Sequence, residues 1–365
     1  MPQDRSAQPG FFTATEIVGR EDWLRLHLNE NPYGPPPGTV DDVCAEASRH
    51  LNRYPDSECG LLRERLAERF RVAPDMIAVG NGTDELVLLA SMTFLREPGS
   101  CVVTTATTFP GYVTSAAAVG APAHVVPLVD AAIPVTGITA AMRQGAALAF
   151  VCNPLNPTGA LLNRDEVMQL IDAAESSGTV LVFDEAYLDF AGPAHEFALE
   201  AVREGRRVLV TRTFSKAWGL ASVRAGFALG PPELIGRIGT TATALPFNVN
   251  RQAQRAALRA LEAPEHLDRV RADNTRVREL LCKTLDSLGL GHWPTAANFV
   301  MVQVPGQGAE PGDSTRLAAR LAEEHHILVR DLTVLGLPGR LRVSVGTQAE
   351  VERLATALTQ LLGRH

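Results

Sequence analysis

The sequence predicts an α/β protein whose central sheet is mostly parallel and covered by helices on both faces. From Asn29 onward, short apolar runs alternate with amphipathic helical stretches, which is the pattern of repeated βαβ units. Four of the runs are apolar throughout, as strands buried on both faces are. These predicted strands are residues 76–79, 147–152, 180–183 and 208–211. A chain of 365 residues is also long enough for two structural units.

The elements of the larger unit follow from local signals. Residues 1–28 show no periodic pattern and are predicted to be an irregular arm. A glycine-rich loop at 80–84 opens a predicted helix at 85–95, and a further strand is predicted at 101–104. Asn163 and Glu166 have the spacing of a capping box, which predicts that a helix begins there.

The alternation of strands and helices stops after residue 264. A long charged stretch at 264–288 predicts one extended helix. The elements predicted after it are strands at 298–302, 327–329 and 341–344, a helix at 314–325 and a final helix from Gln348. We therefore predict three regions: the arm at 1–28, a large domain at 29–264 and a small α+β C-terminal domain at 265–365.

Composition excludes several classes of function. The net charge is −7 and no basic stripe is present, which argues against a nucleic-acid partner. The five cysteines are scattered without metal-ligand spacing, so no metal site is predicted. The chain contains neither an apolar run of membrane-spanning length nor an N-terminal secretory pattern, so no membrane contact and a cytoplasmic location are expected.

Polar clusters follow the predicted strands directly, where open α/β sheets bind their ligands. Lys216 lies in the segment TFSK, just beyond the strand at 208–211. An isolated lysine is usually a solvated surface residue. This one follows a buried strand and is flanked by the hydroxyls of Thr213 and Ser215, with Arg224 eight residues later. A desolvated lysine amine forms Schiff bases with carbonyl compounds, and the neighbouring groups suit a phosphate dianion.

Other clusters contain groups that a flat, charged ligand needs. Asp184 ends the strand at 180–183 and is either a helix N-cap or the partner of a cationic ring nitrogen. Tyr187 is either an ordinary half-buried tyrosine or a hydrogen-bond donor to the same ring. Asn156 lies in a rigid Pro/Gly turn that can direct its amide at a ligand. Phe109 either fills the core or stacks on the ring.

Several ordered motifs together resemble one family. GNGTDE at 80–85, NPLNPTG at 153–159, DEAY at 184–187 and TFSKAWGLASVRAGF at 213–227 resemble the fold type I transferases that depend on pyridoxal 5′-phosphate (PLP). LNENPYG at 28–34, RYPD at 53–56 and LRVSVGT at 341–347 are similar to the histidinol-phosphate aminotransferase-like branch of the class I and II aminotransferases. The resemblance runs from Asn29 to the C-terminus and implies a seven-stranded sheet in the large domain.

The resemblance implies a role for each matching residue. Lys216 matches the lysine that forms the Schiff base with PLP and moves the substrate proton. Asp184 matches the partner of the ring nitrogen, Asn156 and Tyr187 match the partners of the ring hydroxyl, and Phe109 matches the ring-stacking residue. The residues that match the phosphate site are Gly82, Thr83, Asp84, Thr213, Ser215 and Arg224.

The resemblance also implies substrate contacts and a partner. Arg342 matches the arginine that binds the substrate carboxylate or its equivalent, and Arg330 a second arginine at the distal end. Asn29 and Tyr33 lie in a motif expected near the substrate. Tyr54 matches a tyrosine that reaches the cofactor phosphate of the other subunit, which implies a homodimer.

The implied activity is transfer of an amino group from an amino acid, or a histidinol-phosphate-like amine, to a 2-oxo acid by a ping-pong mechanism. Two departures concern the substrate: the arm segment at 9–13 lacks the tyrosine expected there, and Leu155 replaces an asparagine. A specialised amino acid is therefore an open alternative for the substrate. Lyase, cyclase, decarboxylase or oxidase chemistry on the same cofactor is the alternative for the reaction. A PLP-binding regulator is disfavoured because no segment remains for a DNA-binding module.

Overall fold

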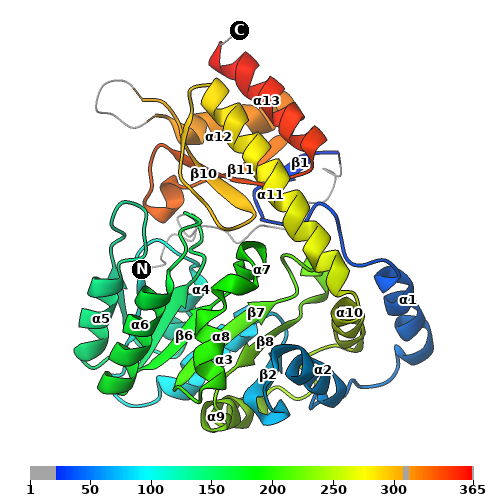
Figure 1. Ribbon diagram of the computed structural model, residues 1–365, viewed down its shortest axis with the longest axis vertical. Helices are drawn as coiled ribbons and strands as arrows, with labels where there is room; N and C mark the ends of the chain where they lie inside the picture. Colours follow the sequence, from blue (N-terminus) through cyan, green and yellow to red (C-terminus); the bar gives the residue numbers. More distant parts are fainter. Residues whose placement is uncertain (1–21, 307–311, 364–365) are drawn as a thin grey trace, which may run out of the picture.

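Two sheets organise the chain. The structure is a computed structural model that describes residues 22–306 and 312–363. Figure 1 shows a seven-stranded sheet with its helices in the lower half of the molecule and a five-stranded sheet above it. Each sheet has its own core of buried apolar side chains.

The larger sheet is mostly parallel, as predicted. In spatial order its strands are β2 (Ile77–Gly80), β8 (Gly226–Leu229), β7 (Val208–Thr213), β6 (Val180–Asp184), β5 (Leu148–Cys152), β3 (Val102–Thr105) and β4 (Ala123–Val126). β8 is antiparallel to β2 and β7, and the other neighbouring pairs are parallel. β3, β5, β6 and β7 are buried along their whole length because both faces are covered. The predicted fold class is confirmed.

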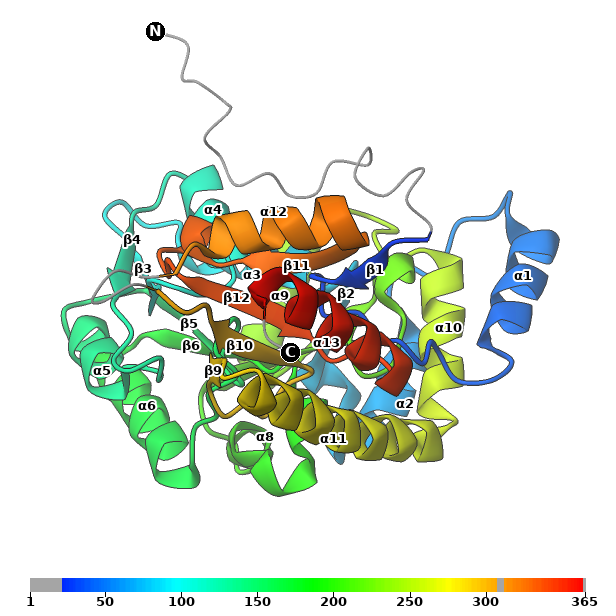
Figure 2. The same ribbon diagram turned by 90° about the horizontal axis from the view of Figure 1, so that it is seen from above.

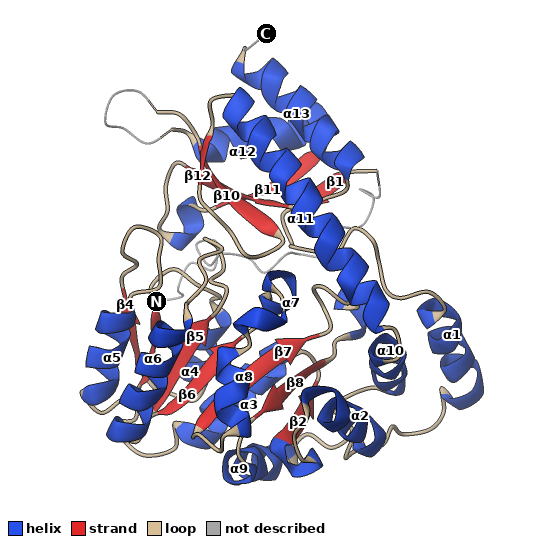
Figure 3. Cartoon of the chain, in the orientation of Figure 1, coloured by secondary structure: helices blue, strands red, loops and turns tan. Residues whose placement is uncertain are grey.

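Helices form the layers on both faces of this sheet. The helices of the larger unit are α1 (Thr39–His50), α2 (Gly60–Phe70), η3 (Pro74–Met76), α3 (Thr83–Phe94), α4 (Gly111–Ala118), α5 (Val135–Arg143), α6 (Arg164–Ser177), α7 (Leu188–Ala191), η4 (Pro193–His195), α8 (Phe197–Arg203), η5 (Ala221–Val223), α9 (Pro232–Ala242) and α10 (Arg251–Leu261). α5, α6 and α8 pack side by side, as do α3, α4 and α9. Figure 3 shows the strands between these helices.

The predicted capping box is present at the start of α6. The Asn163 side chain accepts a hydrogen bond from the Glu166 peptide N–H, and the Glu166 carboxylate accepts one from the Asn163 N–H. Gly178 ends the helix with φ 74°, a conformation that costs glycine little. Both ends of α6 are therefore specified by local sequence.

The smaller sheet is mostly antiparallel. Its strands in spatial order are β1 (Leu24–Leu26), β11 (Ile327–Asp331), β12 (Arg340–Ser344), β10 (Phe299–Gln303) and β9 (Gly291–His292). Its helices are α11 (Pro264–Ser287), α12 (Ser314–His325), η6 (Thr333–Leu335) and α13 (Gln348–Leu362). Viewed from above, α12 and α13 lie over this sheet (Figure 2). β1 pairs in parallel with β11, and the other pairs are antiparallel.

The long helix α11 contributes to both cores. Leu267 and Val270 in its first half pack in the core of the larger unit, whereas Val277 and Leu281 further along pack in the core of the smaller one. The helix predicted at 264–288 is therefore present, and it joins the two units physically. The domain boundary between residues 264 and 265 stays a prediction.

The arm differs from its prediction at one point. Leu24–Leu26 form β1 rather than irregular chain, and their partner in the sheet begins at Ile327. A strand of three residues carries too little alternation to be recognised, and its partner lies near the other end of the chain. Residues 1–21 lie outside the described residues. Within the described ranges, no helix is long and apolar enough to cross a bilayer.

Candidate active site

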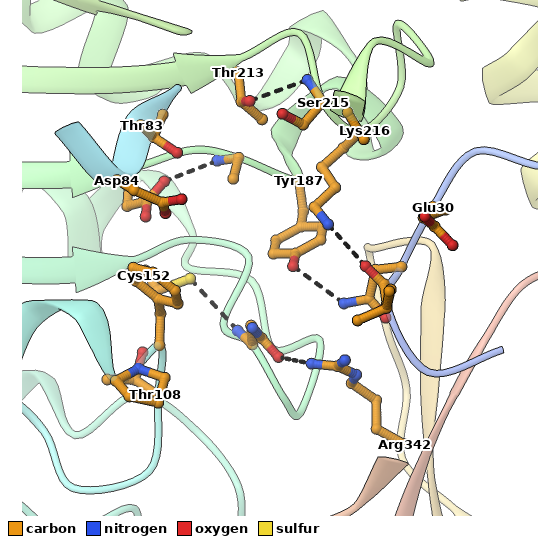
Figure 4. A pocket seen from close by; sticks show the side chains of 18 of the residues that line it. Glu30, Thr83, Asp84, Thr108, Cys152, Tyr187, Thr213, Ser215, Lys216 and Arg342 are labelled. Carbon is orange, nitrogen blue, oxygen red and sulfur yellow. Dashed lines mark hydrogen bonds between the residues drawn. The ribbon is translucent and has the colours of Figure 1, made fainter. Parts of the chain in front are cut away.

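A cavity of about 430 Å³ lies at the carboxyl ends of β5, β6 and β7, between the two units. The sequence-predicted residues that line it are Asn29, Thr83, Asp84, Phe109, Asn156, Asp184, Tyr187, Thr213, Ser215, Lys216, Arg224, Arg330 and Arg342. In Figure 4 the labelled side chains of Lys216 and Tyr187, from the larger unit, and of Arg342, from the smaller one, extend toward the same space. The rule that ligands bind beyond the strand ends therefore located the cavity correctly.

Lys216 follows β7 and extends into the cavity. Its Nζ donates a hydrogen bond to the Leu28 carbonyl at 2.9 Å and lies 5.7 Å from the centre of the Tyr187 ring. Burial, with Arg342 nearby, lowers the pKa of the Lys216 amine to about 8. More of the amine is then neutral near physiological pH than in an ordinary lysine, and only the neutral amine is a nucleophile or a base.

Asp184 is a buried carboxylate at the end of β6. Its Oδ2 accepts a hydrogen bond from the Tyr112 hydroxyl at 2.6 Å, and its Oδ1 accepts one from the Ala186 N–H at 3.2 Å. Burial raises the pKa of Asp184, although these hydrogen bonds oppose the rise. No basic side chain of the described residues forms an ion pair with it. A cation in the cavity would therefore stabilise the ionised form.

Arg342, on β12, carries a buried positive charge. Its Nη1 donates to Asn156 Oδ1 at 2.5 Å and its Nη2 to the His27 carbonyl at 2.7 Å. Burial, reinforced by Arg330, lowers the pKa of its guanidinium to about 10. Among the described residues, no carboxylate pairs with Arg342, and its Nε has no hydrogen-bond partner. A buried guanidinium in this state favours an anionic ligand.

A phosphate-sized site lies where α3 begins. Gly82 has φ 80°, and a Cβ there would lie 2.5 Å from Arg224 Nη2, so only glycine leaves room for the guanidinium. Arg224 donates to Ser215 Oγ at 3.3 Å and pairs with Asp84 at 2.9 Å. The Thr83 side chain lines the cavity at the first turn of the helix. Free N–H groups, hydroxyls and a guanidinium are the donors that bind phosphate.

Three predicted residues do not line the cavity. Gly82 lies behind Arg224. The Tyr33 hydroxyl is buried, and none of the described residues bonds to it. Tyr54 is 78% exposed and stacks on Phe247 with ring centroids 4.6 Å apart.

Sequence reasoning missed other residues that line this cavity or support its lining. Tyr112, on α4, is fully buried and was indistinguishable from a core aromatic, although a buried hydroxyl always needs a partner. The backbone of residues 27–29 follows the unpredicted strand β1, so its carbonyls were not foreseen as partners of the cavity cations. Cys152 also lines the cavity, but burial raises the pKa of its thiol to about 12, so it stays protonated and unreactive.

A buried ionic network lies directly behind the cavity. Arg212 precedes Thr213, and Glu185 follows Asp184, so by strand alternation both point away from the cavity. Arg212 donates to Glu185 Oε2 from Nε at 3.0 Å and from Nη2 at 2.8 Å. The remaining carboxylates around Arg212 belong to Glu196 at 3.0 Å and Asp189 at 3.5 Å. We call Arg212, Glu185, Asp189 and Glu196 the buried ionic network.

The residues of the cavity fit PLP, the cofactor that the family resemblance implies. Asp184 is a buried anion without a basic partner, which suits a protonated pyridine nitrogen. The Gly82–Arg224 approach leaves a cradle that a Cβ would fill, which suits the phosphate. Lys216 supplies an amine of lowered pKa in the same cavity. In the described ranges, no cluster of histidine, cysteine, aspartate or glutamate is arranged to hold a metal ion.

Comparisons with known proteins agree with this chemistry. The family model described as "Aminotransferase class I and II" matches residues 21–358. The histidinol-phosphate aminotransferase of Moorella thermoacetica is 35% identical over 347 residues, covering 94% of this chain and 87% of that protein. The enzyme of the same name from Erythrobacter litoralis is 36% identical over 343 residues, covering 92% and 90%.

A solved structure shows the same likeness in three dimensions. The histidinol-phosphate aminotransferase from Sinorhizobium meliloti, solved in complex with pyridoxal-5′-phosphate, has a TM-score of 0.84 and 28% identity. The match covers 100% of this chain and 98% of that one. These comparisons confirm the predicted resemblance and the predicted cofactor, and they do not favour the lyase, cyclase, decarboxylase or oxidase alternative.

Proposed function

This chain belongs to the class I and II aminotransferases and depends on PLP, and from that premise we propose that Lys216 carries its chemistry. The single observation that supports this most strongly is the convergence of Lys216, Asp184 and Arg342 in one cavity. These are a nucleophilic amine, a buried anion and a buried cation, each without a charged partner among the described residues.

Each of these residues then has a defined task. When bound, PLP supplies an aldehyde that captures amines and a protonated ring that withdraws electrons from the substrate carbon. With PLP bound, Lys216 would be the base that takes the proton from that carbon and the acid that gives it back. Its lowered pKa suits both directions, because a base works best with a pKa near the operating pH. Asp184, held by Tyr112, stabilises the proton on the ring nitrogen.

The remaining lining residues orient the ligands. Tyr187 and Asn156 would hold the ring hydroxyl of the cofactor, and Phe109 would pack on its ring. Arg224, Ser215 and the start of α3 hold the phosphate. Arg342 and Arg330 bind the anionic group of the substrate, because a bidentate guanidinium fixes both the position and the orientation of a carboxylate or phosphate.

We propose that the amino donor is an amine that bears a phosphate or carboxylate and that the acceptor is a 2-oxo acid. Histidinol phosphate is the first donor to test, since several relatives with more than 30% identity carry the name histidinol-phosphate aminotransferase. A specialised amino acid is the second, because the arm segment at 9–13 lacks a tyrosine. That segment lies outside the described residues.

A panel of amino donors tests this proposal. The PLP-loaded protein is mixed with histidinol phosphate or with single amino acids, and the loss of its visible absorption is followed. We expect a donor with an anionic group to convert the cofactor to its amine form, and a 2-oxo acid to restore the absorption. Borohydride should attach the cofactor to wild-type protein at Lys216 and leave Lys216→Ala unlabelled. Normal amino transfer by Lys216→Ala contradicts the proposal.

We further propose that the enzyme is a cytoplasmic homodimer in which Tyr54 reaches the cofactor phosphate of the other subunit. Tyr54 and Phe247 are exposed and stacked, and neighbouring segments expose Leu51, Leu61 and Leu245. Exposed apolar groups gathered in this way favour a protein interface. All five cysteines are free, as is usual in a reducing compartment. Sedimentation velocity measures the assembly, and a fully active monomer contradicts the homodimer.

A further inference from the structure

Asn29 forms hydrogen bonds to residues of both units through its backbone and its side chain. It is only 1% exposed and has φ 55°, an unusual conformation that asparagine tolerates better than most residues. Its peptide N–H donates to Ser344 Oγ at 2.9 Å, and its carbonyl accepts from Asn298 Nδ2 at 3.1 Å. Its side-chain Nδ2 donates to the Tyr187 hydroxyl oxygen at 3.1 Å.

Ser344 determines which way the Asn29 amide faces. The Ser344 oxygen already accepts the Asn29 N–H, and the Ser344 hydroxyl donates its own proton to Asn29 Oδ1 at 3.0 Å. The amide oxygen is therefore directed at Ser344 and the amide nitrogen at Tyr187. An amide nitrogen can only donate, so the Tyr187 oxygen is the acceptor in this hydrogen bond.

The Tyr187 proton is consequently free to point elsewhere. The hydroxyl belongs to Tyr187, which lines the cavity, as Asn29 also does. Figure 4 shows the Tyr187 ring beside the Lys216 side chain. The charged or titratable groups around Tyr187 are Lys216, Arg342, Asp184 and Cys152. Burial raises the pKa of Tyr187 to about 12, so the hydroxyl keeps its proton throughout the neutral range.

We propose that Asn29 is a positioning residue that directs the Tyr187 proton into the cavity, toward an anionic oxygen on the ring of the cofactor. This inference rests on the proposed function, because it requires PLP beside Tyr187. A hydrogen bond donated to an anionic oxygen stabilises the anion, so it lowers the pH at which the bound cofactor loses its proton. Ser344 orients the Asn29 amide, so a residue of the small unit determines the direction of that proton.

The experiment is a pH titration of the visible absorption of the PLP-loaded protein. Asn29→Gly removes the amide and tolerates the positive φ. Asn29→Asp keeps the shape but presents an oxygen that accepts the Tyr187 proton and turns it away from the cavity. We expect the titration midpoint to rise by a few tenths of a pH unit in Asn29→Gly and by about one pH unit in Asn29→Asp.

Two controls separate this role from general loosening. In a Tyr187→Phe background, Asn29→Gly should cause no further shift, and Asn29→Asp should show only the smaller effect of its charge. Asn298→Ala removes a hydrogen bond to the same residue but leaves the bond to Tyr187, so its midpoint should remain that of the wild type.

The outcomes distinguish this inference from the proposed function. The inference is overturned if both Asn29 variants titrate like the wild type, if their shifts persist unchanged in the Tyr187→Phe background, or if Asn298→Ala shifts as much as Asn29→Gly. A wild-type absorption that is lost in Lys216→Ala but insensitive to Asn29 defeats this inference alone. Wild-type protein without any such absorption defeats the proposed function as well.

Discussion

At the ends of β6 and β7, the buried charges that the structure describes have ion-pair partners on one face of the sheet and lack them on the other. On one face, the buried ionic network surrounds Arg212 with three carboxylates at 2.8–3.5 Å. On the other face, Lys216, Asp184 and Arg342 line the cavity without an ion-pair partner among the described residues. Asp184 and Glu185 are neighbours in sequence, yet they lie on opposite sides of this division.

The difference shows how one pair of strands can hold both the buried ionic network and two side chains of the cavity, Lys216 and Asp184, that lack an ion-pair partner in the described part of the chain. A buried charge that has its partners holds the strand ends in register, whereas a buried charge without them destabilises the unliganded fold and favours a ligand. Side chains that line a ligand site also need rigid support from the residues behind them. The contrast predicts that substitutions on the two faces will change stability in opposite directions.

Arg212→Met should produce the largest loss of stability. It leaves the buried carboxylate of Glu185 and the half-buried carboxylates of Asp189 and Glu196 around an apolar side chain, which costs about 3–5 kcal/mol of unfolding free energy. Urea unfolding of the unliganded protein measures this loss. Arg206→Ala is the matched control, because it breaks the more exposed ion pairs with Asp172 and Glu175 and should cost about 0–1 kcal/mol. Equal losses in the two variants would break the comparison.

Lys216→Met should raise the unfolding free energy of the unliganded protein, whereas Arg212→Met should lower it. The folded pKa of Lys216 is about 8 against the ordinary value of 10.5, so the folded state binds fewer protons than the unfolded state between these two pH values. Stability of the wild type then rises with pH across that interval. We expect Lys216→Met to be more stable than the wild type by about 1–3 kcal/mol at pH 7, with the difference vanishing near pH 10.5. Urea unfolding at pH 7 and pH 10 checks the sign, and a destabilised variant at pH 7 contradicts it.

Asp184→Asn and Glu185→Gln compare the two faces of the sheet with the smallest chemical change, the replacement of one carboxylate by its amide. Glu185→Gln weakens the hydrogen bonds to Arg212 and should cost about 1–3 kcal/mol of unfolding free energy, with amino transfer largely retained. Asp184→Asn should leave stability within about 1 kcal/mol, because burial already disfavours this charge, while amino transfer falls by at least about 100-fold. The comparison fails if the two variants lose stability equally.

The sequence predicted the fold class and most of the cavity for physical reasons. Buried parallel strands read as unbroken apolar runs, and the polar residues that follow them, such as Lys216 and Asp184, must meet at one edge of the sheet. Motif resemblance added the residues that no periodicity marks, such as Arg342. These predictions depended on neighbours in sequence or on a family pattern.

What escaped prediction depends on contacts between distant segments. The hydrogen bond from Tyr112 to Asp184 and the hydrogen bonds of Asn29 to Ser344 and Tyr187 join separate elements that no local spacing connects. The different surroundings of Asp184 and Glu185 could not be predicted either. The sequence does not show which of two adjacent carboxylates forms an ion pair with Arg212.

The parallel pairing of β1 with β11 has a consequence for how the chain is made. A ribosome releases Leu24–Leu26 early, whereas the strand with which they pair begins at Ile327 and is synthesised about 300 residues later. The smaller sheet can therefore be completed only when nearly the whole polypeptide has left the ribosome. Closing so long a loop is entropically costly and slow, so Leu24–Leu26 remain unpaired during most of synthesis. A fragment that lacks either end of the chain should lack a complete second sheet.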